Sequence, residues 1–240
     1  MVLKRFSLVV ALALGAWIGG ASRVAADAPP ASPADASYGY SLSKAGQQFA
    51  HTTVTVKHDA TDVALHEVET FTSIATPYTV DETLDPVGLV PTSYAVTFPI
   101  NAQVTVTAHL TFDLGGAHES VDGTTGSTDL RLEPGTKNQV VIDAALMSGF
   151  LMLPAQAKAQ SLTTFTSLAP TSTTALSLKV DPAATPARPA GVPARDASLS
   201  IEGSVNFIEW YDPSSMVVDE VDVPAQLVTI SRNSGTNGRP

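Results

Sequence analysis

Residues 144–154 read Ala-Ala-Leu-Met-Ser-Gly-Phe-Leu-Met-Leu-Pro, and this uncharged stretch decides the fold. Its only hydroxyl belongs to Ser148, and its content of Ala, Leu and Met favours a helix. Asp143 is suited to an N-cap, so we expect the helix to begin at Ala144. Pro154 is expected to kink the helix or to end its first half. A helix that is apolar nearly all round is typical of a buried position.

Most of the remaining chain alternates between apolar and polar residues, the pattern of a strand with one buried face. The clearest case is Gln103–Asp113, in which every second residue is apolar. Gly115-Gly116 marks a hairpin turn, and strands joined by such short connections pair antiparallel. Strands are predicted at residues 38–43, 50–57, 63–74, 93–98, 103–113, 127–132, 162–168, 175–180, 198–211, 217–221 and 226–231.

Many antiparallel strands and one apolar helix are compatible only if the sheet curls, because a flat sheet would leave most of the helix in water. Burial of Leu146, Met147, Phe150, Leu151 and Met152 stabilises the fold by roughly 8–15 kcal/mol before entropy is subtracted. The predicted fold class is therefore mainly β, with a curved antiparallel sheet, a half-barrel or β-spiral, wrapped on one apolar helix.

The N-terminal residues have the pattern of a secretory signal peptide. Lys4 and Arg5 precede an apolar run over residues 6–18, and Val24-Ala25-Ala26 resembles a cleavage site. Residues 1–26 are predicted to be removed near Ala26, which indicates a periplasmic or secreted protein. No later apolar stretch reaches the length that spans a membrane, so no transmembrane segment is expected in the mature chain.

The mature chain is expected to contain one domain. Residues 27–36 are rich in Pro and Ala and are predicted to form a spacer. A single β-rich domain follows over residues 37–232, and residues 233–240 are predicted to be a disordered tail. The Pro-rich run 181–195 is interpreted as a surface arm, with a mobile flap as the alternative.

Charge and cysteine content exclude several function classes. The 240 residues include 23 acidic and 13 basic side chains, a net charge of −10, which repels nucleic-acid phosphates. The absence of cysteine excludes disulfides, thiolate metal sites and cysteine nucleophiles. No nucleic-acid partner is therefore expected.

No complete catalytic or metal motif is present. His66-Glu67-Val68-Glu69-Thr70 begins like a zinc-protease motif but lacks the second histidine. Ser148 lacks the G-x-S-x-G surroundings of an acyl-transfer nucleophile. The pairs Glu67 with Glu69 and Asp219 with Asp222 are interpreted as exposed charges that discourage edge pairing. No catalytic residue, metal site or cofactor is predicted.

Several short motifs resemble a group of exported bacterial envelope proteins of unknown function, over most of residues 37–232. The motifs are Leu84-Asp85-Pro86, Leu89-Val90-Pro91-Thr92-Ser93-Tyr94, Ile142-Asp143, Ser148-Gly149-Phe150-Leu151-Met152-Leu153-Pro154 and Glu209-Trp210-Tyr211-Asp212-Pro213. The β-rich domains of that group are considered similar to the curved sheet of lipoprotein-localisation carriers and to the β-spiral of envelope-integrity proteins. The resemblance implies a half-barrel or spiral and an envelope location. It implies no catalytic residues; the carriers hold acyl chains in their concave face.

The leading hypothesis is a non-enzymatic envelope protein that binds an apolar or amphiphilic ligand, such as a lipid, or an envelope partner protein. The residues expected to contact the ligand are Tyr94, Met147, Phe150, Leu151, Met152 and Trp210. One alternative is a metal- or carboxylate-dependent hydrolase that uses His66, His109 or His118 with nearby acids. A second alternative is a purely structural or interaction module with sheet edges open to strand addition.

Overall fold

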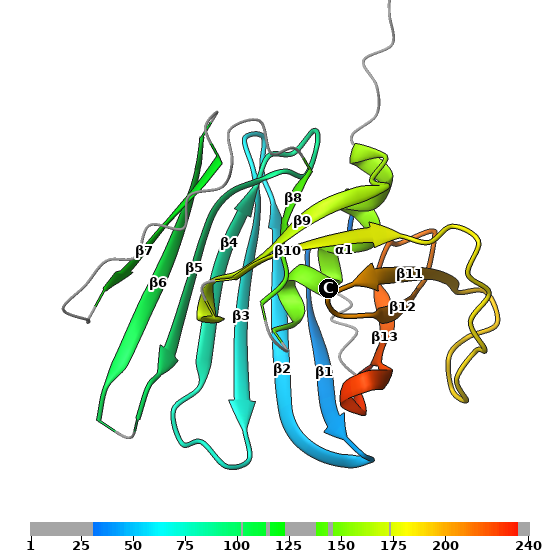
Figure 1. Ribbon diagram of the computed structural model, residues 1–240, viewed down its shortest axis with the longest axis horizontal. Helices are drawn as coiled ribbons and strands as arrows, with labels where there is room; N and C mark the ends of the chain where they lie inside the picture. Colours follow the sequence, from blue (N-terminus) through cyan, green and yellow to red (C-terminus); the bar gives the residue numbers. More distant parts are fainter. Residues whose placement is uncertain are drawn as a thin grey trace, which may run out of the picture.

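A computed structural model describes residues 31–101, 103–113, 116–122, 138–143, 146–172 and 174–234. These residues form one sheet of fourteen strands in the order β7-β6-β5-β4-β3-β2-β1-β14-β13-β12-β11-β10-β9-β8 (Figure 1). The strands are β1 (Ala36–Lys44), β2 (Gln47–His58), β3 (Val63–Phe71), β4 (Tyr78–Leu84), β5 (Pro91–Pro99), β6 (Thr105–Asp113), β7 (Gly116–Asp122), β8 (Gln139–Val141), β9 (Thr164–Ala169), β10 (Thr174–Val180), β11 (Ala197–Gly203), β12 (Phe207–Tyr211), β13 (Val218–Val223) and β14 (Val228–Arg232). The helices are α1 (Met147–Gln160) and the short 3₁₀ turns η1 (Pro170–Ser172) and η2 (Pro224–Gln226).

The alternating sequence pattern locates most of these strands, with several differences. The run 198–211 forms two strands rather than one, because the Asn206 Oδ1 accepts a hydrogen bond from the Gly203 N–H at 3.0 Å and closes a turn between them. β4 ends at Leu84, as expected of the strand before the Leu84-Asp85-Pro86 motif, although its start was not placed from the sequence, and β8 is absent from the predicted strands. β7 was expected only as the second arm of the hairpin at Gly115-Gly116. The strand predicted at 127–132 lies outside the described residues.

The sheet departs from antiparallel pairing at one place in the described chain. β8 and β9 pair parallel, with Val140 opposite Ser167. Parallel neighbours need a long crossover connection, and α1 supplies it between these two strands. The helix is therefore placed against the face of the sheet by the chain connection as well as by its composition.

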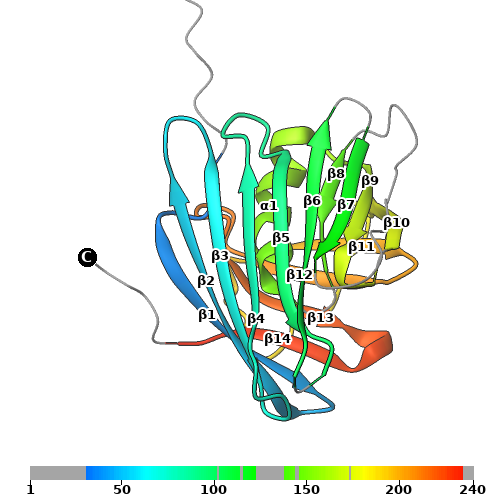
Figure 2. The same ribbon diagram turned by 90° about the vertical axis from the view of Figure 1, so that its left-hand side faces the viewer.

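The sheet does not close; it curls until one end packs over the other (Figure 2). One hydrophobic cluster joins the two ends of the sheet. It contains Tyr94 of β5 and Leu110 of β6 from one end, and Val141 of β8, Leu168 of β9 and Leu146, which precedes α1, from the other. The β8 end thus covers the concave face of the β4–β7 end and does not pair with its edge. This spiral arrangement confirms the predicted curved, mainly β fold.

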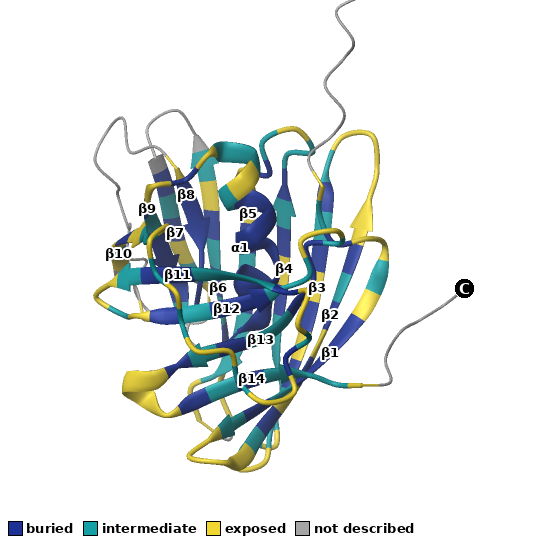
Figure 3. Cartoon of the chain, turned by 90° about the vertical axis from the view of Figure 1, so that its right-hand side faces the viewer, coloured by how far each residue is buried: buried dark blue, intermediate teal, exposed yellow. Residues whose placement is uncertain are grey.

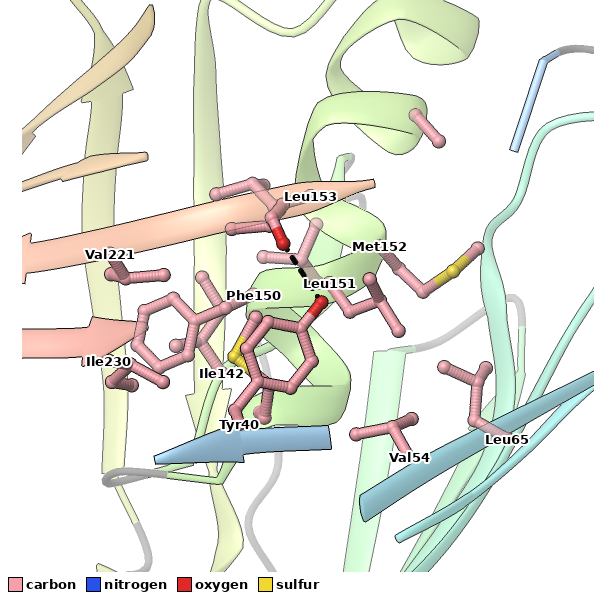
Figure 4. Close-up of a cluster of buried hydrophobic side chains, with 14 of the residues drawn as sticks. Tyr40, Val54, Leu65, Ile142, Phe150, Leu151, Met152, Leu153, Val221 and Ile230 are labelled. Atoms are coloured by element: carbon pink, nitrogen blue, oxygen red, sulfur yellow. Dashed lines mark hydrogen bonds between the residues drawn. The ribbon is translucent and has the colours of Figure 1, made fainter. Parts of the chain in front are cut away.

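The helix lies inside the curl, as its uncharged sequence predicts. Every residue from Met147 to Gln156 is buried, and Figure 3 shows exposure only toward the C-terminal end of α1. Its side chains point to opposite walls (Figure 4): Phe150 lies toward Val221 and Ile230, and Met152 lies toward Leu65. None of the helices in the described chain is long and apolar enough to span a membrane.

The helix start differs from expectation, and Pro154 does not end the helix. The first helical residue is Met147, and the N-cap residue Leu146 makes no side-chain capping bond. Asp143 does not cap the helix, because its carboxylate accepts hydrogen bonds from the Thr171 N–H, at 2.9 Å, and the Thr171 hydroxyl. The helix continues through Pro154 to Gln160, and burial of the surrounding turn compensates for the missing N–H bond.

At Gly149 the helix α1 lies in close contact with the backbone of β8. A Cβ at this position would overlap the carbonyl oxygen of Val141 in β8. We expect Gly149→Ala to destabilise the protein by about 1–3 kcal/mol through this overlap. Helix propensity alone would make the same substitution stabilising by about 1 kcal/mol. Urea unfolding of the two proteins gives the sign, and a stabilised variant would contradict the packing described here.

Candidate functional site

An apolar cavity of about 540 Å³ lies between α1 and the C-terminal half of the sheet. Fifteen residues from both halves of the chain line it: Lys44, Phe49, Ile142, Phe150, Ser167, Ala169, Ser172, Leu176, Leu178, Val205, Phe207, Val223, Gln226, Val228 and Ile230. This volume is within the range of pockets that hold one small organic ligand. The helix therefore fills the concave face only in part.

The floor of the cavity is apolar. Phe150 of α1 and Phe207 of β12 meet edge to face, with ring centroids 5.3 Å apart. Val223 pairs with Val228 across β13 and β14, and Ile230 lies two residues further along β14, on the same face as Val228. The alternation of these strands directs this set of side chains inward, while their neighbours point to solvent.

The mouth of the cavity is formed by its exposed lining residues. Lys44, at the end of β1, and Gln226, in η2, are exposed, as is Ser172 in η1. The Ala45 N–H donates to the Leu227 carbonyl at 2.8 Å and joins the turn after β1 to the residue after η2. Polar groups thus surround the opening of an otherwise apolar space.

The structure separates the six residues predicted to contact a ligand. Phe150 lines the cavity. Met147, Leu151 and Met152 are fully buried in the core around α1, and they are not among the cavity-lining residues.

Tyr94 and Trp210 lie elsewhere. Tyr94 is buried on the concave face of β5 under the β8 end. Trp210 lies on the face of β12 opposite to Phe207, and the Arg188 guanidinium stacks on its ring at 4.7 Å from the centroid. Arg188 also donates to the Asp196 carbonyl at 2.8 Å, so part of the Pro-rich run 181–195 is held over Trp210.

The histidines of the hydrolase alternative lie away from the cavity. The His66 Nδ1 is 2.8 Å from Asp81, and the His109 Nε2 is 3.3 Å from Asp122, all with exposed side chains. His118 lies on β7, opposite Thr111 of β6. Within the part of the chain that the structure describes, no group of three or more His, Asp or Glu side chains is arranged to hold a metal ion.

Glu67 anchors the N-terminus of α1. Its Oε1 accepts from the Met147 N–H at 2.8 Å and from the Thr52 hydroxyl at 2.7 Å, and its Oε2 accepts from the Ser148 N–H at 2.8 Å. These are the first two N–H groups of the helix, which have no partner within it and carry its positive dipole end. Burial raises the pKa of Glu67, and the three hydrogen bonds act against this rise. The expectation of an exposed charge was wrong for this residue.

Other carboxyl groups on the concave face are buried without such partners. Glu69 is fully buried, and within the described part of the chain neither of its oxygens accepts a hydrogen bond; the Oε2 of Glu82 also has no partner there. Burial, with a contribution from the Glu67 charge, raises the pKa of Glu69 to about 9 and that of Glu82 to about 8. The pair Glu67 and Glu69 therefore consists of one acid that anchors the helix start through hydrogen bonds and one acid without a partner, which is neutral at pH 7. The exposure predicted for Glu69 was also wrong.

Asp219 and Asp222, interpreted from the sequence as exposed, are half-buried on β13. Asp219 pairs with Arg232 of β14 at 3.1 Å. Neither residue is at a sheet edge, because β13 lies between β12 and β14. The prediction that these two residues discourage pairing at a sheet edge was therefore wrong.

Most of the cavity lining was not singled out from the sequence. Phe207, Val223, Val228 and Ile230 carry a detectable signal, because they occupy one face of alternating strands near the C-terminus. Lys44 carries none, since Lys-Ala-Gly has the composition of an ordinary solvent-exposed turn.

No protein-family model matches the chain, and neither a curated protein nor a solved structure shows significant similarity to it. The cavity and its lining are therefore the basis for a functional proposal.

The same isosteric change at Glu67 and at Glu69 should have opposite effects. Glu67→Gln replaces one of the two carboxyl oxygens that accept the helix N–H groups by an NH2 group, so we expect a loss of about 1–3 kcal/mol in the free energy of unfolding. Glu69→Gln replaces an unpaired buried acid and should raise Tm at pH 7.5 by about 2–4 °C, the equivalent of about 1 kcal/mol. Thermal unfolding of both variants measures this, and two changes of the same sign would contradict the anchor role of Glu67.

The neutral acids also predict a pH dependence of stability. A carboxyl group whose pKa is raised by folding contributes stability below its unfolded pKa of 4.5, and this contribution is lost as the pH rises toward 9 for Glu69 and 8 for Glu82. We expect the free energy of unfolding to fall between about pH 4.5 and pH 9. The double variant Glu69→Gln/Glu82→Gln should show a smaller fall in urea titrations across this range, and an unchanged profile would exclude these groups as its cause.

Proposed function

We propose that this chain is an exported, non-enzymatic envelope protein that binds an apolar or amphiphilic small molecule in the cavity between α1 and strands β9–β14. The observation that carries the proposal is a cavity of about 540 Å³ with a floor of aliphatic and aromatic side chains and polar groups at its mouth. Ligand pockets have this composition, with apolar walls that supply affinity and a few polar groups that orient the ligand.

The architecture supports binding rather than simple packing. Interiors are normally filled to crystal-like density, and a void of this size forfeits the contacts that its lining atoms would otherwise make. The helix already buries ten consecutive residues, so the fold does not need this space for its own core. A ligand would supply the missing contacts and would stabilise the folded state by mass action.

Export is part of the proposal and is supported by the sequence pattern over residues 1–26. An envelope location would expose the protein to amphiphiles that are scarce in the cytosol. Mass spectrometry of an organic extract of the purified protein tests for a retained ligand. Recovery of an apolar compound in stoichiometric amount is the expected result.

Blocking the cavity should abolish binding without unfolding the protein. Leu176 of β10 is a half-buried lining residue, and Ser177 lies on the opposite, exposed face of the same strand. We expect Leu176→Trp to weaken binding of a fluorescent alkyl probe at least tenfold, and Ser177→Trp to leave the dissociation constant unchanged. Equal binding by both variants would show that the probe does not occupy this cavity.

Affinity should also depend on the length of the alkyl chain. Each buried methylene contributes about 0.8 kcal/mol, so Kd should fall roughly fourfold per methylene until the cavity is full. Displacement of the probe by a homologous series measures this dependence. A Kd that does not change with chain length would be inconsistent with tail burial.

A further inference from the structure

The cavity described above carries a single formal charge, and it is positive. Among its lining residues only Lys44 is ionic, and the other polar side chains are Ser167, Ser172 and Gln226. In the whole chain acidic residues outnumber basic ones by 23 to 13. From the composition alone, a charged residue in the cavity lining would be expected to be an acid. The lysine at the mouth instead gives the cavity a charge opposite to the net charge of the protein.

Lys44 is held at the mouth by its backbone. Lys44 pairs with Val228, which also lines the cavity, across strands β1 and β14. The next two residues, Ala45 and Gly46, adopt positive φ angles of 49° and 79° and turn the chain back into β2. The lysine thus lies at the exposed end of a ladder whose inward side chains form part of the floor.

The ammonium group of Lys44 makes no ion pair with any residue in the described part of the chain. Several other cations in the same half of the sheet are engaged: Lys179 pairs with Glu202 at 2.7 Å, and Arg232 pairs with Asp219 at 3.1 Å. Lys44 therefore has its charge available for a ligand at the opening. A lysine is suited to this role, because its compact charge at the end of a flexible stem can follow a headgroup.

We infer that the ligand is a single-chain amphiphile with an anionic headgroup, whose tail occupies the cavity and whose headgroup lies against Lys44. This inference rests on the proposed function and specifies its ligand class. A cavity of about 540 Å³ suits one chain, and the lone cation at its mouth selects a negative end over a neutral one. The shared chemistry is an anion on an alkyl tail, which a carboxylate or a phosphate can supply.

The test compares three ligands of one chain length on the full chain: an alkyl carboxylate, an alkyl phosphate and the uncharged alcohol. Each is titrated against a bound fluorescent alkyl probe that carries no charge. The variants are Lys44→Gln, Lys44→Glu and the control Lys57→Gln, which removes an exposed lysine of β2 that does not line the cavity.

We expect both anions to bind the unmodified protein about threefold to fivefold more tightly than the alcohol does, the size of an exposed ion pair. Lys44→Gln should remove this preference, Lys44→Glu should reverse it, and Lys57→Gln should retain it. High salt should also reduce the preference, because it screens an exposed pair. A preference for only one of the two anions identifies the headgroup and supports the inference.

Two results would count against these proposals, and they are distinguishable. If the acids and the alcohol bind equally and Lys44→Gln changes nothing, the headgroup inference fails while the proposed function stands. If Leu176→Trp weakens the binding of none of the ligands and not that of the uncharged probe, the proposed function fails. The inference then fails with it.

Discussion

The structure depends on the burial of a helix that has no polar face. A helix of this kind must be surrounded, and a sheet can surround it only by curling and by adding enough strands to reach both sides. Burial also removes water from the first N–H groups of the helix, which then need a partner from the protein. Glu67 meets this need from β3, with hydrogen bonds of 2.8 Å to the N–H groups of Met147 and Ser148.

Two hydrogen bonds attach α1 on the side away from the cavity. Glu67 ties the helix start to the N-terminal half of the sheet, and Gln156 ties its third turn to the Leu89 carbonyl at 2.9 Å. Both contacts draw α1 toward β3 and the segment after β4. The unfilled space lies on the other side, against strands β9–β14. The cavity thus lies on the side of α1 opposite to these two hydrogen bonds.

Local patterns in the sequence predicted the helix and most of the strands. The contacts between residues far apart in the sequence could not be predicted from them. The uncharged residues 144–154 predicted a buried helix, and Phe150 is buried as expected. The helix start was misplaced because the capping carboxylate comes from a residue 80 positions away, while the adjacent Asp143 binds Thr171. Glu67 and Glu69 share one face of a strand whose other face carries His66, Val68 and Thr70, so the local sequence gives no reason to expect the acids to be the buried set. Lys44 gains its significance only from the strand that pairs beside it.

Hydrogen exchange of the α1 amides, followed by mass spectrometry of peptides, tests the central claim that this helix is the buried anchor of the fold. If the helix is enclosed and capped as described, the amides from Phe150 to Gln156 exchange as slowly as those of the central strand β2. Exchange as fast as that of the exposed run 181–195 would contradict the account.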